Sequence, residues 1–141
     1  MLDIITLADA VAAEINTGSF SVPISAQRLL LPEFELADLA QLKVTVVPKS
    51  VEMATLTRQT MVYEVAIDVG IQKKLSGEVD TELPGLLALA EEINVFLRKR
   101  SIAGAVWTRS SINPIYARDH LAQSRVFTSV ITITYKIAME D

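Results

Sequence analysis

Cysteine is absent from this chain of 141 residues, and histidine occurs only once. Without cysteine and with a single imidazole, the chain lacks the ligands of the common zinc sites and the thiolate of a cysteine nucleophile. The one histidine, His120, stands beside Asp119 in a polar stretch, where an exposed loop side chain is the simplest interpretation. Ser110 and Ser111 lack the Gly-x-Ser-x-Gly pattern of a nucleophile elbow. We therefore expect a protein that is not an enzyme.

Glycine is scarce as well, with five residues in the whole chain. Gly77 and Gly85 stand alone, so the sequence has neither a phosphate-binding loop nor a dinucleotide fingerprint. The acidic stretch 78–82 lacks the aspartate and glycine spacing of a calcium loop, and a solvated acidic loop is the simpler interpretation. We expect no cofactor and no metal site.

Positive charge is in deficit, since 13 Lys and Arg face 17 Asp and Glu for a net charge of −4. A protein that binds nucleic acid usually presents a basic surface. The basic trio at 98–100 is better explained as favourable charge at the end of a helix. We expect no specific binding of nucleic acid.

Long hydrophobic runs are missing too. No apolar run approaches the roughly 20 residues that cross a bilayer. The amino-terminal residues lack the basic start and the apolar core of a secretory signal. We expect neither a membrane segment nor secretion, and the lack of cysteine fits the cytosol.

Hydrophobic side chains, in contrast, are abundant: they make up 50% of the residues, with a mean hydropathy of +0.35. This is rich for a soluble domain, and the excess apolar surface predicts an interface between subunits. The length suits a single domain over residues 1–141, because no repeat, linker or low-complexity stretch divides the chain.

Residues 59–73 and 124–138 alternate between apolar and polar side chains with period two, which predicts two long strands with one dry face each. A helix is predicted over 83–100, because its apolar residues recur every three or four positions, and a second helix over 4–15. The helix stripes and the dry sheet face can bury each other.

Three shorter strands complete the predicted sheet. Residues 20–26 alternate, but Pro23 cannot donate to a ladder, so this strand should lie at an edge. Another strand, over 42–47, ends at Pro48, and a third spans 105–113. The predicted fold class is α+β, with a mostly antiparallel mixed sheet of about four to five strands and two helices packed on one face.

Glu64 and Asp68 share one face of the strand predicted over 59–73. Four residues of strand separate them by about 13 Å, farther apart than the acid–base carboxylates of glycosidases. Cross-strand pairing with Lys136 or with the facing threonines is the simpler role for both.

A succession of short segments follows the chain from one end to the other: FSVPI at 20–24, PEFEL at 32–36, LKVTVVP at 42–48, YEVAIDV at 63–69, QKKL at 72–75, NPIY at 113–116, His120 with Leu121, and FTSVI at 127–131. This succession resembles small structural proteins of tailed bacteriophages and prophages. Within that group, size and element order are most similar to those of the tail terminator, or tail-completion, proteins. The pattern covers most of the chain and consists of strands and turns without a catalytic motif.

The resemblance implies α+β subunits that form a hexameric ring, cap the finished tail tube and join the tail to the head. The implied partners are copies of the chain, the tail tube protein and head–tail connector proteins, with DNA passing through without specific binding and no membrane contact. The implied location is the tail or neck of the virion, and the host cytoplasm during assembly. Another head–tail connector or neck protein, or a small adaptor module that binds a protein or a ligand, stays open as an alternative.

A ring subunit needs complementary apolar patches on two different sides, because rotationally related neighbours meet through unlike surfaces. We predict these patches at Phe20, Val22 and Ile24 of the edge strand and around Trp107 and Tyr116. A lumen through which DNA passes is expected to be polar or acidic. The candidate lumen-facing residues are the acidic side chains Glu64, Asp68, Glu78, Asp80 and Glu82.

Overall fold

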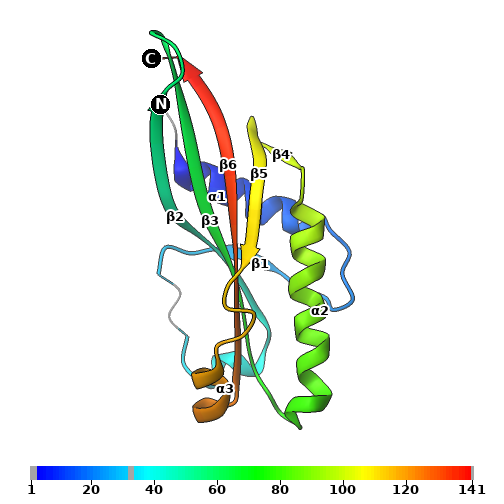
Figure 1. Cartoon of the computed structure of the whole chain (residues 1–141). Coiled ribbons are helices and arrows are strands. Elements are labelled where there is room, and N and C mark those ends of the chain that lie inside the picture. The colour runs from blue at the N-terminus through cyan, green and yellow to red at the C-terminus, as the bar shows by residue number, and fades with distance from the viewer. Residues whose placement is uncertain (1–2, 32–33, 141) are drawn as a thin grey trace.

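The computed structural model describes residues 3–31 and 34–140 and arranges them around a six-stranded sheet in the order β1-β2-β3-β6-β5-β4 (Figure 1). The strands are β1 (Ala26–Arg28), β2 (Lys43–Thr55), β3 (Thr60–Lys74), β4 (Ser101–Ile102), β5 (Ala105–Ile112) and β6 (Val126–Glu140). The helices are α1 (Ile4–Asn16), α2 (Val79–Leu97) and α3 (Arg118–Ser124), with a short 3-10 turn, η1, at Asp38–Ala40.

The predicted α+β class with a mixed, mostly antiparallel sheet is confirmed. β1 runs parallel to β2, and all other neighbouring strands are antiparallel. The described residues form six strands and three α-helices, where about four to five strands and two helices were expected. The extra elements are short ones, which leave little periodic signal in a sequence.

The two long strands predicted from period two are confirmed as β3 and β6, each shifted by one or two residues. They pair along their whole length, from Thr60 opposite Glu140 to Lys74 opposite Val126. Their inward side chains are completely buried and form the centre of the core: Val65, Ile67, Val69, Ile71, Ile131, Ile133 and Tyr135.

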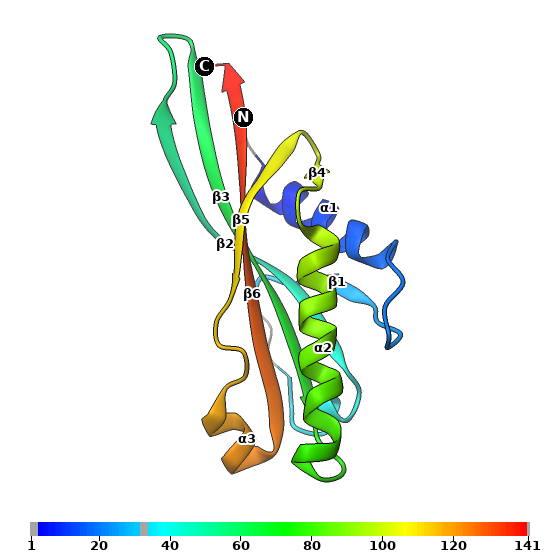
Figure 2. The same cartoon turned by 45° about the vertical axis from the view of Figure 1, so that its right-hand side comes forward.

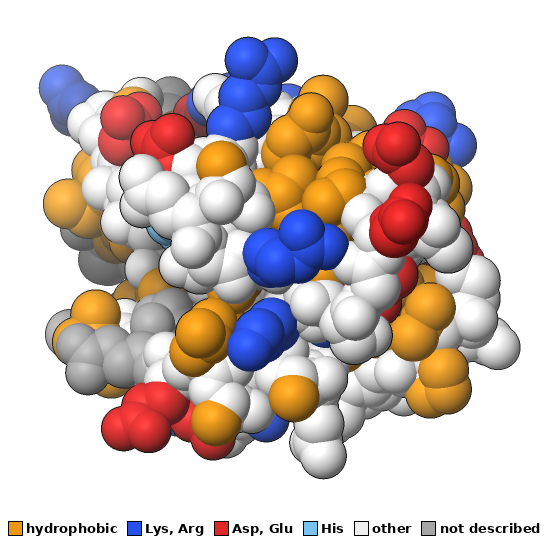
Figure 3. Space-filling model, turned by 90° about the horizontal axis from the view of Figure 1, so that it is seen from below, with side chains coloured by type: hydrophobic (Ala, Val, Ile, Leu, Met, Phe, Trp, Pro, Cys, Tyr) orange, Lys and Arg blue, Asp and Glu red, His pale blue; other side chains and the backbone are white. Residues whose placement is uncertain are grey.

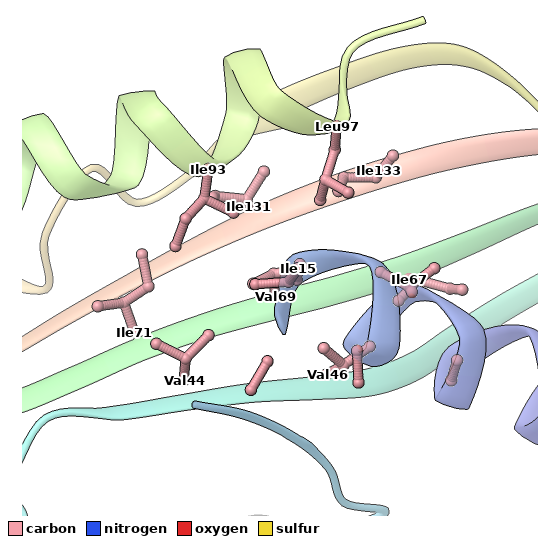
Figure 4. Close-up of a cluster of buried hydrophobic side chains, with 14 of the residues drawn as sticks. Ile15, Val44, Val46, Ile67, Val69, Ile71, Ile93, Leu97, Ile131 and Ile133 are labelled. Atoms are coloured by element: carbon pink, nitrogen blue, oxygen red, sulfur yellow. The ribbon is translucent and has the colours of Figure 1, made fainter. Parts of the chain in front are cut away.

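α1 and α2 cover one face of the sheet, with α1 crossing the strands and α2 running along them (Figures 1 and 2). In Figure 4, Ile93 and Leu97 of α2 point toward Ile131 and Ile133 of β6, and Ile15 of α1 lies near Val69. All of these side chains are 0% exposed. The apolar stripes of both helices therefore bury the dry face of the sheet, as the periodicity predicts.

α2 begins at Val79, earlier than the predicted 83, and ends at Leu97, earlier than 100. The stretch 78–82, predicted as an acidic loop, is instead the cap and first turn of this helix. Acidic side chains stabilise a helix N-terminus because they face its unpaired N–H groups. Glu82 closes the preceding turn by accepting a hydrogen bond from the Gly77 amide at 2.8 Å.

The edge strand predicted over 20–26 is wrong in its position, because only its last residue belongs to β1. The segment before β1 packs on α2 instead of joining the sheet. Phe20 meets the ring of Phe96 edge-on at a centroid distance of 5.3 Å, and the Ser21 amide donates to the Glu92 carboxylate at 2.9 Å. These side-chain contacts, together with the missing N–H of Pro23, outweigh the alternating pattern.

β2 does not end at Pro48 but continues to Thr55 and forms a hairpin with β3. The register shifts between Pro48 and Ser50, so a bulge accommodates the proline. The outer edge of β2 at this point has no strand beside it in the described part of the chain, and a proline there costs no ladder hydrogen bond.

The polar loop predicted around 118–120 is a short helix, α3, packed beside β6. Its backbone begins after a turn that contains the cis peptide bond Asn113–Pro114. His120 is exposed, and its Nδ1 lies 3.0 Å from the Thr128 hydroxyl. The predicted strand before this turn is confirmed as β5, with Trp107 inside it.

Candidate assembly interface

The free ends of β2, β3 and β6 extend beyond α1 and project from the body of the molecule (Figures 1 and 2). We call residues 51–64 and 136–139 the arm. Its strands are held in register through pairs such as Val51 with Val65 and Met53 with Tyr63. These pairs place Val51 and Met53 on the side of the sheet that faces the helices lower down, because directly opposite residues in a ladder share a face.

The helix-side face of the arm is apolar and open to solvent. On this face Val51 and Met53 are 40% and 64% exposed, and Leu56, directly after the end of β2, is 61% exposed. Half-buried hydrophobic residues lie beside them on β3 and β6: Met61, Tyr63, Ile137 and Met139. Exposed apolar surface of this kind, gathered on one projecting element, is typical of a contact site for another protein.

Two strand edges are open on opposite sides of the sheet. β1 pairs with β2 only at 44–46, and within residues 3–31 and 34–140 no strand pairs with the outer edge of β2 over 47–55. On the other side, β4 pairs with β5 only at 105–106, which leaves the outer edge of β5 over 107–112 unpaired in the same described ranges. Such edges present free N–H and C=O groups, to which a further strand can pair.

A shallow apolar groove runs along the outer side of α2. Phe20, Phe96 and Val95 line it, and Val95 is 57% exposed. The guanidinium group of Arg100 stacks on Phe96, 3.9 Å from the ring centroid. The Ser21 hydroxyl, followed by the Ser21 amide, lowers the pKa of Glu92, because both donate to its carboxylate.

The five residues predicted for the two patches of the subunit interface are half-buried, and their role in assembly stays a prediction. Phe20, Ile24, Trp107 and Tyr116 pack against the core of their own subunit. The more exposed apolar residues of the arm, Val51, Met53 and Leu56, were not predicted. The alternation of Val51 and Met53 with polar neighbours was visible in the sequence, but the expected stop at Pro48 hid it.

Glu64 and Asp68 lie on the face of β3 opposite the helices, as their spacing predicts. Asp68 accepts a hydrogen bond from the Thr132 hydroxyl at 2.6 Å and lies 3.9 Å from the Lys49 ammonium group. Cross-strand pairing of Asp68 with a threonine is therefore confirmed.

Glu64 forms an ion pair with Arg109 at 2.8 Å, although Lys136 stands directly opposite it in the ladder. The arm end of this open face thus combines carboxylates with cations. It is polar and charge-balanced rather than acidic.

Glu78, Asp80 and Glu82 do not join Glu64 and Asp68 on one surface, because they lie at the N-cap and in the first turn of α2, on the helix side of the sheet. Glu82 lies 3.7 Å from the Lys73 ammonium group, and the Gly77 amide lowers the pKa of its carboxyl. Figure 3 shows the end of the molecule viewed from below, where acidic, basic and hydrophobic side chains are interspersed.

Among the described residues, no group of three or more His, Asp or Glu side chains is placed to hold a metal ion. No helix in this part of the chain is long and apolar enough to span a bilayer. Tyr135 is fully buried in the core, and burial raises the pKa of its hydroxyl.

Comparison with known proteins gave no matching family model and no matching curated sequence. Among solved structures, the chain is similar to one from the virion of a native gene transfer agent particle. The two share 11% sequence identity, with a TM-score of 0.48, over 96% of this chain and 95% of the other. At this level of similarity, the function has to be argued from the molecule itself.

Proposed function

We propose that this chain is a structural protein of a phage-like particle and works by assembling with copies of itself. The observation that carries this proposal is the arm, whose apolar side chains Val51, Met53 and Leu56 are left exposed although Ile137 and Met139 lie beside α1. Keeping such a surface in water is unfavourable, and burying it against a second copy removes the cost. The two open strand edges add backbone groups that are also without partners within the described chain.

The finer role that we propose is that of a tail terminator, a hexameric ring that caps the tail tube and joins the tail to the head. This role follows from the sequence resemblance described above. The proposed partners are further copies of the chain, the tail tube protein and the head–tail connector proteins, in the tail or neck of the virion.

The open sheet face suits a ring lumen. Glu64 is paired with Arg109, and Asp68 with Lys49, so these two cations are balanced by carboxylates and are not free to hold the DNA backbone. In this proposal DNA passes the face without specific binding.

A variant with Met53→Lys and Leu56→Lys tests the assembly function, because both side chains are exposed and belong to the arm. We expect the wild-type chain to form a defined oligomer, visible as rings by negative-stain electron microscopy, and the variant to stay monomeric. Its melting temperature should be nearly unchanged, since surface substitutions rarely alter stability by more than about 0.5 kcal/mol.

The matched control is Ile115→Lys, which removes a hydrophobic side chain of similar exposure, 57%, from the turn before α3. This control should assemble like the wild type. If the arm variant assembled as well as the control, the arm would not be the contact surface, and the proposed function would lose its main support.

A further inference from the structure

The two open strand edges belong to one sheet and lie on opposite sides of it. We propose that residues 51–55 of β2 pair antiparallel with residues 107–112 of β5 from a second copy, so that one sheet continues from subunit to subunit. This inference rests on the proposed function, since it describes how the self-assembly is made.

The directions of the two edges fit this pairing. β2 is antiparallel to β3, β3 to β6, and β6 to β5, so β2 and β5 run in opposite directions within one subunit. When copies are related by rotation about an axis roughly along the strands, β2 of one copy therefore meets β5 of the next in antiparallel orientation. Each copy uses a different edge on each side, as a closed ring requires.

Within one subunit the two segments meet at one level of the sheet, from which residues 52–55 continue toward the tip of the arm and residues 108–112 away from it. The registers connect Val51 to Val65, Val65 to Tyr135 and Tyr135 to Trp107, so Val51 and Trp107 lie at the same level. Strands in a closed barrel are staggered along the axis, so β5 of a neighbour meets β2 at a shifted height. Both edges are long enough to pair over several residues with such a shift.

The upper half of β2 is the part suited to pairing. Its lower half carries Pro48, Lys49 and a bulge, all of which discourage a further strand. Residues 51–55 contain one charged side chain, that of Glu52. Apart from Glu52, this half thus lacks the charges, prolines and bulges by which natural proteins protect an open edge.

Side chains on the two edges match in character as well. Val51 and Met53 lie on the helix-side face, where β5 presents Trp107 and Ile112, both half-buried against the core. Pairing in a face-matched register places apolar side chains beside apolar side chains, which stabilises adjacent strands.

The absence of native cysteine makes disulfide cross-linking a clean test. Ser111 lies on the open face of β5, opposite Thr132, and is exposed. Ser111→Cys is combined in turn with Ser50→Cys, Glu52→Cys or Ala54→Cys, three exposed positions on the same face of β2. These three pairs sample registers two residues apart while keeping the face.

The expected result is a ladder of covalent oligomers under mild oxidation for at least one of the three pairs. Each single-cysteine variant can form no more than a dimer. The control pair Ala54→Cys with Glu91→Cys, which joins the β2 edge to the exposed outer side of α2, should give no ladder. Circular dichroism checks that each variant is folded.

If light scattering shows oligomers but none of the three pairs forms a ladder, the edge pairing is wrong while the proposed assembly function stands. If the wild-type chain is monomeric at all concentrations, both are wrong. Hydrogen exchange gives a second readout that needs no substitution, because backbone amides over 51–55 should become protected on assembly. Unchanged exchange in the assembled protein would overturn the pairing.

Discussion

Single carboxylates at the surface of this protein act as caps for backbone groups. Asp3 accepts hydrogen bonds from the Ile5 and Thr6 amides and caps α1, and the Thr6 hydroxyl lowers the pKa of its carboxyl. Glu82 closes the turn before α2, and Glu92 holds the segment around Ser21. None of these partners was predicted from the sequence, because the contacts depend on how the backbone turns.

The Glu92→Gln variant tests the contact between α2 and the segment around Ser21. The pKa of Glu92 is lowered from 4.5 in the folded protein, so the charged form stabilises the fold above this pH. That contribution is lost as the pH falls through the folded pKa. We expect the variant to be less stable than the wild type at pH 7 and the difference to shrink below pH 4.5, as followed by thermal unfolding.

The neighbouring substitution Glu91→Gln is the matched control, since Glu91 is exposed at the rim of the groove on α2. Its difference from the wild type should be small and should vary little with pH. Equal pH profiles for the two variants would show that the bond from Ser21 does not stabilise the fold.

Gly18 and Gly85 should respond in opposite ways to alanine. A Cβ at Gly18 would lie 2.7–2.9 Å from atoms of the Phe20 and Phe96 rings, so Gly18→Ala should cost about 1–3 kcal/mol. Gly85 lies within α2, and a Cβ there would meet no atom within 4 Å. Gly85→Ala should therefore raise the free energy of unfolding by about 0.5–1 kcal/mol. Chemical denaturation of both variants measures this, and equal effects would contradict the packing of Phe20 on Phe96.

At the scale of the elements, strict patterns predicted the long strands and the main helices. The period-two residues of β3 and the stripe of α2 are set by burial against each other, and burial leaves a regular pattern in the sequence. Short elements were missed because their position depends on contacts elsewhere. β1 lies where the Asn16 side chain bonds both backbone groups of Ala26, at 2.7 and 3.0 Å.

The two prolines used to predict strand positions, Pro48 and Pro23, led to one wrong and one correct prediction. Pro48 suggested the end of a strand, but a bulge at an open edge lets β2 continue into the arm. Pro23 correctly argued against a regular interior strand. The pattern around Pro48 does not show that the outer edge of β2 is left unpaired. The arm could therefore not be predicted from it.

Within α2, neighbouring hydrophobic residues should differ sharply in their effect on stability. Ile93 is completely buried, and Ile93→Ala should cost about 2–5 kcal/mol because it leaves a cavity against β6. Val95 is 57% exposed, and Val95→Ala should change stability by less than about 0.5 kcal/mol. Urea unfolding compares them, and similar losses would contradict the assignment of the buried stripe.

At the scale of the whole molecule, one covered and one uncovered apolar region account for the high hydrophobic content. The helices cover the lower part of the sheet, and the arm beyond them keeps Val51, Met53 and Leu56 exposed. Composition predicted that excess apolar surface would exist, but its location depends on how far α1 and α2 reach over the strands. The predicted patches, on the edge strand at Phe20 and around Trp107 and Tyr116, were chosen from the sequence without this information.

Sedimentation equilibrium of the wild-type chain at rising concentration tests self-assembly most directly. The proposed function predicts that the mass rises from that of the single chain, 15.4 kDa, to a fixed multiple of it. A chain that keeps the single-chain mass up to about 1 mM has no self-association of useful strength. That result would contradict the claim that copies of this protein pack together through the arm.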